Sequence, residues 1–271
     1  MSGNAGIDRP PARVERPEPG VAVLFLDRPQ QRNALSVAMM AALHGELATL
    51  GTDPTVAAIV IAAEGPAFCA GHDLKELTAH RDAPDGGRIF FTETMTRCAE
   101  LMQAVVACPK PVIAAVHGIA TAAGCQLVAT CDLAVAEEDS RFATPGVNIG
   151  LFCSTPMVAL ARNVPRKRAM EMLLLGEMMG AAEAAEYGLV NRIVAKGEAY
   201  ATALDMARII ASKSPLTVAI GKKAFYDQID MPLGQAYDFA AQVMVENMLK
   251  ADAAEGIGAF LEKRDPVWKG C

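Results

Sequence analysis

The chain has 271 residues, of which 52% are hydrophobic and 21% are charged, and its formal net charge is −6. This composition is typical of a globular protein that can bury a large core, and it excludes a disordered chain. Because the net charge is negative and the sequence shows no basic stripe, we expect no nucleic-acid partner.

The seven cysteines are odd in number, lie mostly in apolar runs and form no C-x-x-C pair. This pattern favours reduced thiols, and from it we expect a cytoplasmic protein. The four histidines are scattered, so no metal site is predicted. Residues 1–18 are rich in Pro, Arg and Glu and lack the apolar stretch of a signal peptide, which predicts a loose tail. No apolar run is unbroken enough to span a bilayer, so no membrane partner is expected.

Strands and helices alternate over most of the chain. Strands are expected over residues 20–26, 56–63, 111–116 and 132–136, and helices over 36–50, 88–106, 122–130, 165–175 and 181–187. The alternation predicts an α/β fold with crossover connections. From about Glu198 onward the pattern is almost entirely helical, with Asp252 and Glu255 resembling a capping box for the last helix. We therefore expect residues 198–271 to be a helical oligomerisation region.

Two strand–turn–helix units contain the most informative segments. In the first, Ala70-Gly71 follows an apolar strand and precedes the helix-starting run Asp73-Leu74-Lys75. In the second, the run Ala122-Ala123-Gly124 follows the next strand. Two such turns can direct two backbone N–H groups at one oxygen, an arrangement that stabilises a carbonyl as it becomes an enolate.

Several segments in this order resemble the enoyl-CoA hydratase/isomerase, or crotonase, family. They are Arg28-Pro29, Asn33-Ala34-Leu35, the run from Phe68 to Leu74, the run from Lys110 to Gly118, the run from Cys131 to Ala136, and the run from Phe260 to Arg264. The segments 122–126 and 142–148 look most like the subgroup called enoyl-CoA hydratase domain-containing protein 3. The resemblance implies a crotonase-like (ClpP/crotonase) spiral of ββα units over residues 19–197, followed by a helical trimerisation region, in a homotrimer or a hexamer made of two trimers.

The resemblance also implies a coenzyme A thioester as substrate and no permanently bound cofactor. It places the two oxyanion-hole N–H groups at His72 and Ala123. It further implies coenzyme A contacts by one set of residues: Arg32 and Ala34 beside the pantetheine or phosphates, Ala70, Gly71, Asp73 and Leu74 beside the adenine, and Lys263 on the nucleotide of a neighbouring subunit.

Two positions depart from the family pattern. Hydratases of the family use two glutamates as an acid/base pair, and here those positions hold Gln126 and Gly146. A glutamine amide does not transfer protons near neutral pH, and glycine has no side chain. A placed acid or base contributes about 10²- to 10⁴-fold to a rate. The sequence thus predicts a protein that polarises a thioester but hydrates it inefficiently.

We expect an enoyl-CoA hydratase-like lyase acting on acyl-CoA in fatty-acid or related metabolism. One alternative is an acyl-CoA decarboxylase-type lyase, since such members of the family resemble this chain at His72, although Cys153 stands where they have a tyrosine. Another is a non-catalytic acyl-CoA binder or regulator. The His72 side chain is open to a structural or a catalytic role, Asp73 is expected to be a helix cap, and Glu93 is a further acid candidate.

Overall fold

The computed structural model describes residues 9–271. Its main sheet has six strands in the order β1-β2-β3-β4-β6-β9, and a smaller sheet has the order β5-β7-β8. The strands are β1 (Ala12–Glu18), β2 (Gly20–Leu26), β3 (Val56–Ala63), β4 (Val112–Val116), β5 (Ile119–Thr121), β6 (Leu133–Glu137), β7 (Arg141–Ala143), β8 (Met179–Gly180) and β9 (Arg192–Val194). From β2 to β9 the main sheet is parallel, as the alternation of strands and helices predicts.

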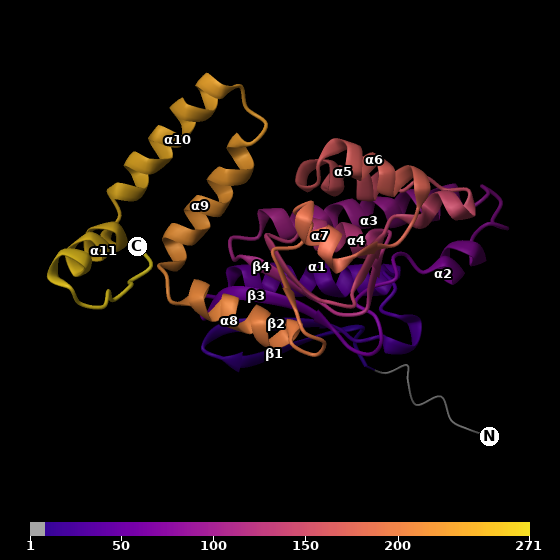
Figure 1. The fold of residues 1–271 in the computed structure, drawn as a ribbon, viewed down its shortest axis with the longest axis horizontal. Coiled ribbons are helices and arrows are strands. Elements are labelled where there is room, and N and C mark those ends of the chain that lie inside the picture. Colours follow the sequence, from indigo (N-terminus) through magenta and orange to yellow (C-terminus); the bar gives the residue numbers. More distant parts are fainter. Residues whose placement is uncertain (1–8) are drawn as a thin grey trace.

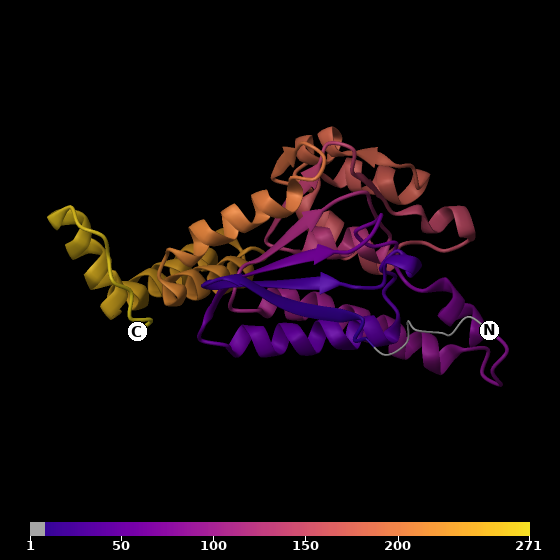
Figure 2. The ribbon, with the colours of Figure 1, turned by 90° about the horizontal axis from the view of Figure 1, so that it is seen from below.

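Helices cover both faces of the main sheet (Figure 1). The helices of this part of the chain are α1 (Val37–Thr52), α2 (Leu74–Ala79), α3 (Arg88–Ala107), α4 (Ala123–Thr130), α5 (Ser154–Asn163), α6 (Arg166–Leu175), α7 (Ala181–Glu186) and α8 (Ala199–Ala211), with short 3₁₀ turns η1 (Pro29–Gln31) and η2 (Pro145–Ile149). Successive residues of β2 point to opposite faces. Leu24 therefore packs into the core with α1 and α3, whereas Val23 packs with α8. Figure 2 shows α1 lying along one face of the strands.

The prediction that residues 1–18 form a loose tail is wrong for residues 12–18. These residues form β1, which pairs antiparallel with β2, with Ala12 opposite Leu26. Ala12 and Val14 face the core while Arg13 and Glu15 face outward, so the strand alternates. Four prolines nearby, Pro10, Pro11, Pro17 and Pro19, hide this pattern, but an edge strand tolerates proline because one of its sides needs no ladder partner. The remainder of the predicted tail in residues 1–8 lies outside the described residues.

The capping box expected at the last helix is also wrong. That helix, α11 (Ala251–Glu262), begins after Lys250 without a side-chain cap. Asp252 instead accepts hydrogen bonds from Ser214 Oγ at 2.6 Å and from backbone N–H groups near the C-terminus. Glu255 pairs with Arg264. The two carboxylates hold the C-terminal segment rather than the helix start.

The last three helices project from one end of the core (Figures 1 and 2). They are α9 (Pro215–Gln228), α10 (Leu233–Met248) and α11. Neither α9 nor α10 contains a buried residue, whereas α8 buries one side against the sheet. Within residues 9–271, no helix is both long and apolar enough to cross a membrane.

Candidate functional site

The two turns that the sequence singled out lie against each other. Thr121 N–H donates to Cys69 O at 2.9 Å, which joins the two segments. Gly71 has φ +91°, and a Cβ added to it would stand 2.9 Å from Ala122 Cβ and 3.4 Å from Ala123 N. Only glycine allows this approach. The chain therefore brings the backbone around residues 71 and 72 to the N-terminus of α4.

The backbone N–H groups of His72 and of the first residues of α4 lack an acceptor within residues 9–271. Neighbouring groups are paired, as where Leu35 N–H donates to Gly71 O at 2.7 Å. The N–H groups of His72 and Ala123 donate to no acceptor in the part of the chain that the structure describes. Ala123 is 1% exposed, and a buried unpaired amide is costly. Since Ala123 also begins α4, its N–H lies at the positive end of that helix. The pair is suited to hold an oxygen that gains negative charge.

The turn that places the second N–H is strained. Ala122 has φ 51° and ψ −118°, a region that residues with a Cβ rarely adopt. Its own N–H donates to Ala143 O at 2.9 Å, which holds this conformation. Such backbone strain costs about 1–3 kcal/mol and tends to occur at functional sites.

The side chain of His72 is enclosed. Its Nδ1 lies 3.3 Å from Leu35 O, and because a carbonyl accepts, Nδ1 carries the proton. Its Nε2 is buried and has no partner among residues 9–271. Burial lowers the pKa of His72, and the Leu35 carbonyl partly offsets this. The imidazole is therefore neutral near pH 7, with Nε2 available as an acceptor only.

Gln126 lies in the first turn of α4 and is 4% exposed. Its Oε1 accepts a weak hydrogen bond from the thiol of Cys98 on α3, with an S–O distance of 3.7 Å. The acceptor for this thiol is therefore an uncharged amide oxygen rather than a carboxylate. Glu93, the other acid candidate on α3, is exposed and paired with Arg97.

Gly146 is the second of the two positions that differ from the pattern of the family in the sequence. The segment that follows it in the chain covers it. Leu151 N–H donates to Gly146 O at 2.9 Å. A Cβ on Gly146 would stand 2.8 Å from Leu151 O and 2.9 Å from Cys153 Sγ. A side chain at residue 146 would thus meet backbone and a thiol.

The two segments expected to border coenzyme A are also neighbours. Ala70 N–H donates to Arg32 O at 3.0 Å, and Leu35 and His72 form an isolated parallel bridge. Arg32 has φ 50°, in the left-handed region. The loop that contains Ala34 therefore lies beside the turn that contains the first free N–H.

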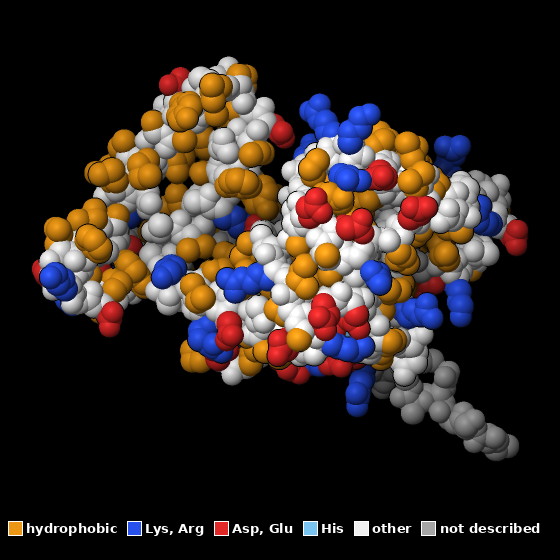
Figure 3. Space-filling model, viewed as in Figure 1, with side chains coloured by type: hydrophobic (Ala, Val, Ile, Leu, Met, Phe, Trp, Pro, Cys, Tyr) orange, Lys and Arg blue, Asp and Glu red, His pale blue; other side chains and the backbone are white. Residues whose placement is uncertain are grey.

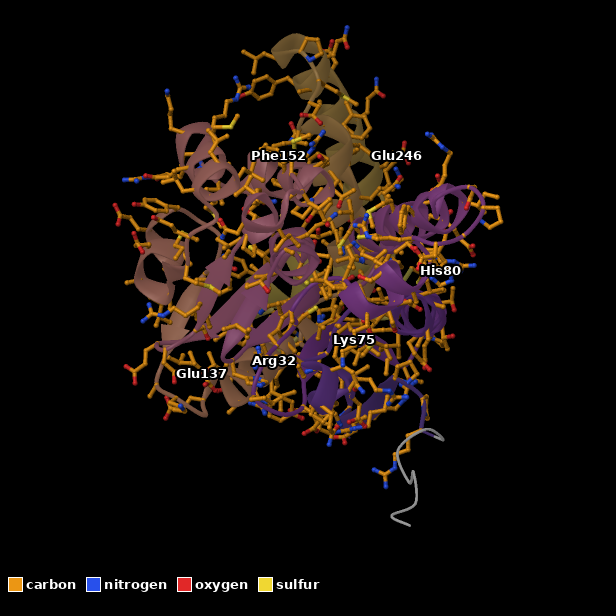
Figure 4. The ribbon with its side chains drawn as sticks, turned by 90° about the vertical axis from the view of Figure 1, so that its right-hand side faces the viewer. Arg32, Lys75, His80, Glu137, Phe152 and Glu246 are labelled. Atoms are coloured by element: carbon orange, nitrogen blue, oxygen red, sulfur yellow. The ribbon has the colours of Figure 1, made fainter. Side chains whose placement is uncertain are left out.

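The start of α2 adds one residue that the sequence reasoning missed. Asp73 Oδ1 accepts hydrogen bonds from Lys75 N–H and Glu76 N–H, so the expectation that it caps a helix is confirmed. Leu74 is exposed. Figure 4 labels Lys75 and Arg32, two cations on these adjacent segments. Lys75 becomes a candidate for binding phosphate groups only because its segment contacts the loop that contains Arg32. Lys263 is the C-cap residue that follows α11, on the projecting C-terminal helices, and its contact with a neighbouring subunit stays a prediction.

Comparison with known proteins decides the family. The family model described as enoyl-CoA hydratase/isomerase matches residues 16–271. The chain belongs to the enoyl-CoA hydratase/isomerase family. It is 48% identical, over 93% of its length and 83% of the relative's, to the rat protein named enoyl-CoA hydratase domain-containing protein 3, mitochondrial. The crystal structure of the human protein of that name aligns with 47% identity and a TM-score of 0.90 over 95% of this chain and all of that one. An enoyl-CoA hydratase from Mycobacterium smegmatis aligns with 52% identity and a TM-score of 0.91, covering 96% and 99% of the two chains.

These matches confirm both the crotonase-like fold and the subgroup that the segments 122–126 and 142–148 resemble. They contradict the expected cytoplasmic location, because the rat and human relatives of this enoyl-CoA hydratase/isomerase family member are both named mitochondrial. The physical reason for the error is that unpaired thiols indicate only a reducing environment. They do not distinguish between two compartments that are both reducing.

Proposed function

We propose that this protein binds acyl-CoA thioesters and stabilises their enolate form through the N–H groups of His72 and Ala123. The observation that carries the proposal is the pair of unpaired amides at one junction, one of them almost fully buried. A thioester oxygen bound there accepts two hydrogen bonds that strengthen as negative charge develops on it. Because the donors are held by the fold, they need no rearrangement during the reaction.

The coenzyme A part of the substrate is assigned to the adjoining segments. In this proposal Arg32 and Ala34 lie along the pantetheine or phosphates. The turn of Ala70 and Gly71 and the start of α2, with Asp73 and Leu74, border the adenine. Support comes from the backbone contacts that join these segments to the first oxyanion donor.

By family the activity is that of an enoyl-CoA hydratase-like lyase in fatty-acid or related metabolism. Hydration needs a base that activates water and an acid that protonates the acyl α-carbon. Gln126 can orient a water molecule or the acyl group, but its amide exchanges no proton, and Gly146 provides no group at all. The thioester is therefore polarised as in a hydratase while the proton transfers remain slow, at a cost of about 10²- to 10⁴-fold per missing group.

Decarboxylation of an acyl-CoA that carries its own carboxylate is the second candidate. In that reaction the C–C bond electrons flow into the thioester, CO₂ leaves, and solvent protonates the enolate. It needs the two N–H donors and no acid/base pair. The neutral His72 imidazole and the uncharged Gln126 favour it, because they do not repel a substrate carboxylate. A non-catalytic acyl-CoA binder or regulator is the remaining alternative.

We also propose a homotrimer, alone or as two trimers in a hexamer. Apolar side chains gather over α9 and α10 on the face shown in Figure 3. Leu233 and Tyr237 on α10 are 75% and 71% exposed. Further copies of the chain would cover this surface, which is too extensive for a solvated monomer.

Two variants of one residue test the oxyanion role. His72→Pro deletes the N–H, and His72→Ala keeps it while removing the imidazole. Turnover of crotonyl-CoA and of a malonyl-type thioester, with the melting-temperature shift on adding coenzyme A, is measured for each. We expect His72→Pro to lose about 10²- to 10³-fold of whichever turnover wild type shows. His72→Ala should lose much less.

Full activity in a folded, coenzyme A-binding His72→Pro variant would show that the oxyanion assignment is wrong. Binding without any turnover in wild type would favour the non-catalytic alternative. Brisk hydration of crotonyl-CoA by wild type would show that another residue supplies the proton.

A further inference from the structure

The segment after η2 folds back onto Gly146. Leu151 N–H donates to Gly146 O at 2.9 Å, and Gly150 makes the reversal with φ +76°. Cys153 then turns its thiol inward and is 8% exposed, while Ile149 and Phe152 remain outside at 58% and 43%. The loop is therefore closed around residue 146 with its apolar side chains outward and one thiol inward.

This closure depends on the absence of a side chain at residue 146. A Cβ there would stand 2.8 Å from the Leu151 carbonyl oxygen and 2.9 Å from Cys153 Sγ, both closer than real Cβ atoms come to other atoms. The first of these neighbours is backbone and cannot rotate away. Any side chain at 146 thus has to displace residues 151–153.

The thiol that fills the place is not a substitute acid. Burial raises the pKa of Cys153, and the Gly146 amide only partly offsets this. The thiol stays protonated near pH 7 and uncharged. Behind it, Cys125 is completely buried, and burial raises the pKa of its thiol to about 12.

We propose that Cys153 and the Leu151 carbonyl determine the reaction type of this site, by closing the place in which a second acid would stand. The inference rests on the proposed acyl-CoA function and deepens it. In this view, residue 146 and residues 151–153 form one coupled unit. Restoring glutamate at 146 alone is insufficient, because the new side chain has no room until the segment opens.

The first part of the test measures the steric coupling without any substrate. Gly146→Ala adds only the Cβ. We expect it to lower the melting temperature by about 3–10 °C. Cys153→Gly removes the thiol and loosens the segment. When Gly146→Ala is added to Cys153→Gly, it should therefore lower the melting temperature by no more than half as much as it does in wild type. Gly45→Ala is the matched control, because Gly45 lies inside α1 with nothing within 4 Å of an added Cβ.

The second part measures hydration of crotonyl-CoA in the Gln126→Glu background. Adding Gly146→Glu should leave the rate within about tenfold of that background. Adding Cys153→Gly as well should raise it by about 10²-fold or more, as a newly placed acid does. The coenzyme A-dependent shift in melting temperature is recorded for every variant, wild type included.

The outcomes separate the two proposals. If Gly146→Ala is as stable as Gly45→Ala, or if Gly146→Glu gains full hydration without Cys153→Gly, the coupling does not exist and this inference is overturned. If no variant binds coenzyme A, the proposed function fails, and the melting temperatures still decide the coupling. If the triple variant does not fold, the Gly146→Ala and Cys153→Gly pair decides it alone.

Discussion

The central sheet and the C-terminal helices use the same kind of apolar residues in opposite ways. Leu24 on β2 and Ile59 on β3 are completely buried, because α1, α3 and α8 of the same chain cover the two faces of the sheet. On α10, Leu233 and Met248 are 75% and 59% exposed, and the helix buries none of its residues. The core is complete within one chain, whereas the C-terminal helices have apolar surface that a single chain does not cover.

A small polar network attaches the second region to the first. Lys222 on α9 donates to the carbonyl oxygens of Val105 and Lys110 and to Asp132 Oδ2 at 2.7 Å. Tyr226, one turn later, donates to Asp132 Oδ1 at 2.9 Å. Burial and the Asp132 carboxylate raise the pKa of Tyr226, so its hydroxyl stays a donor. The orientation of α9 is thus set by polar contacts rather than by apolar burial.

Removing the cation of this network should have the largest effect. Lys222→Met leaves the Asp132 carboxylate without its charged partner in a site where the two side chains are 6% and 16% exposed. We expect a loss of about 3–5 kcal/mol in the free energy of unfolding, measured by urea denaturation. Lys223→Met is the control, because that side chain is 77% exposed and its ion pair contributes little. Equal losses in both variants would contradict the role of the network.

An acidic residue on α10 should disrupt assembly while leaving the core intact. Leu249, the C-cap residue that follows α10, is 75% exposed in one chain. Placed in a contact between copies, a glutamate there should cost about 2 kcal/mol or more of binding energy. We expect Leu249→Glu to dissociate the oligomer in light scattering over a range of concentrations. Ile209→Glu is the control. It also replaces an exposed apolar residue by glutamate, at 57% exposure, but on α8 and outside the apolar surface of α9 and α10. Identical behaviour of the two variants would argue against α10 as the interface.

Asp252 gives the C-terminal region a dependence on pH. Its carboxylate is 1% exposed and accepts hydrogen bonds from Ser214 Oγ and from the N–H groups of Lys269 and Gly270. The Ser214 hydroxyl, followed by these N–H groups, lowers the pKa of Asp252 below its usual value of 3.8. Asp252→Asn should cost about 1.5–3 kcal/mol at pH 7, as charged hydrogen bonds do.

The sign of the pH effect follows from that lowered pKa. The stabilisation is complete above the ordinary carboxylate pKa and is lost as the pH falls through the lower value of the folded state. The urea midpoints of wild type and Asp252→Asn should therefore converge below about pH 4. Asp230→Asn is the control, because it changes an exposed carboxylate that forms no ion pair between residues 9 and 271, and its urea midpoint at pH 7 should stay close to that of wild type. If the difference between the urea midpoints of wild type and Asp252→Asn does not become smaller in acid, this account is wrong.

The smallest expected effect lies in the core, at its strained turn. Ala122→Gly relieves a backbone conformation that costs about 1–3 kcal/mol, against an entropy loss of about 0.5–1 kcal/mol for glycine. We expect a net gain of about 1 kcal/mol in the free energy of unfolding. Ala41→Gly, at an exposed helical position in α1, should instead lose about 1 kcal/mol. A loss at both positions would show that Ala122 is not strained.

The long apolar strands and helices could be predicted from the sequence, but the short elements could not. The strands at residues 20–26 and 56–63 are confirmed with the expected bounds, because continuous apolar runs end sharply at polar or turn residues. The strands β5, β7 and β8 have only two or three residues each. They exist because distant segments pair, as Phe142 does with Ala120 and Met179, and no local pattern announces such pairing.

The same division holds at the candidate site. Two strand–turn–helix units in the sequence predict that the turns of His72 and Ala123 direct their N–H groups at one oxygen, and the structure places these turns against each other. Lys75 was missed, because its significance depends on the contact between its segment and the loop at Arg32. Gly146 was read as a missing side chain, and the sequence did not show that Leu151 and Cys153 occupy the space.

The sequence by itself determined the family, the α/β architecture, the two strand–turn–helix units and the presence of Gln126 and Gly146, because these depend on residue identity and on local periodicity. Only the tertiary structure decided that the Ala122 backbone is strained, that Asp252 holds the C-terminal segment instead of capping a helix, and that the place beside Gly146 is closed. Each of these depends on atoms brought together from distant segments, and their distances are set by packing rather than by any property of the residues in isolation.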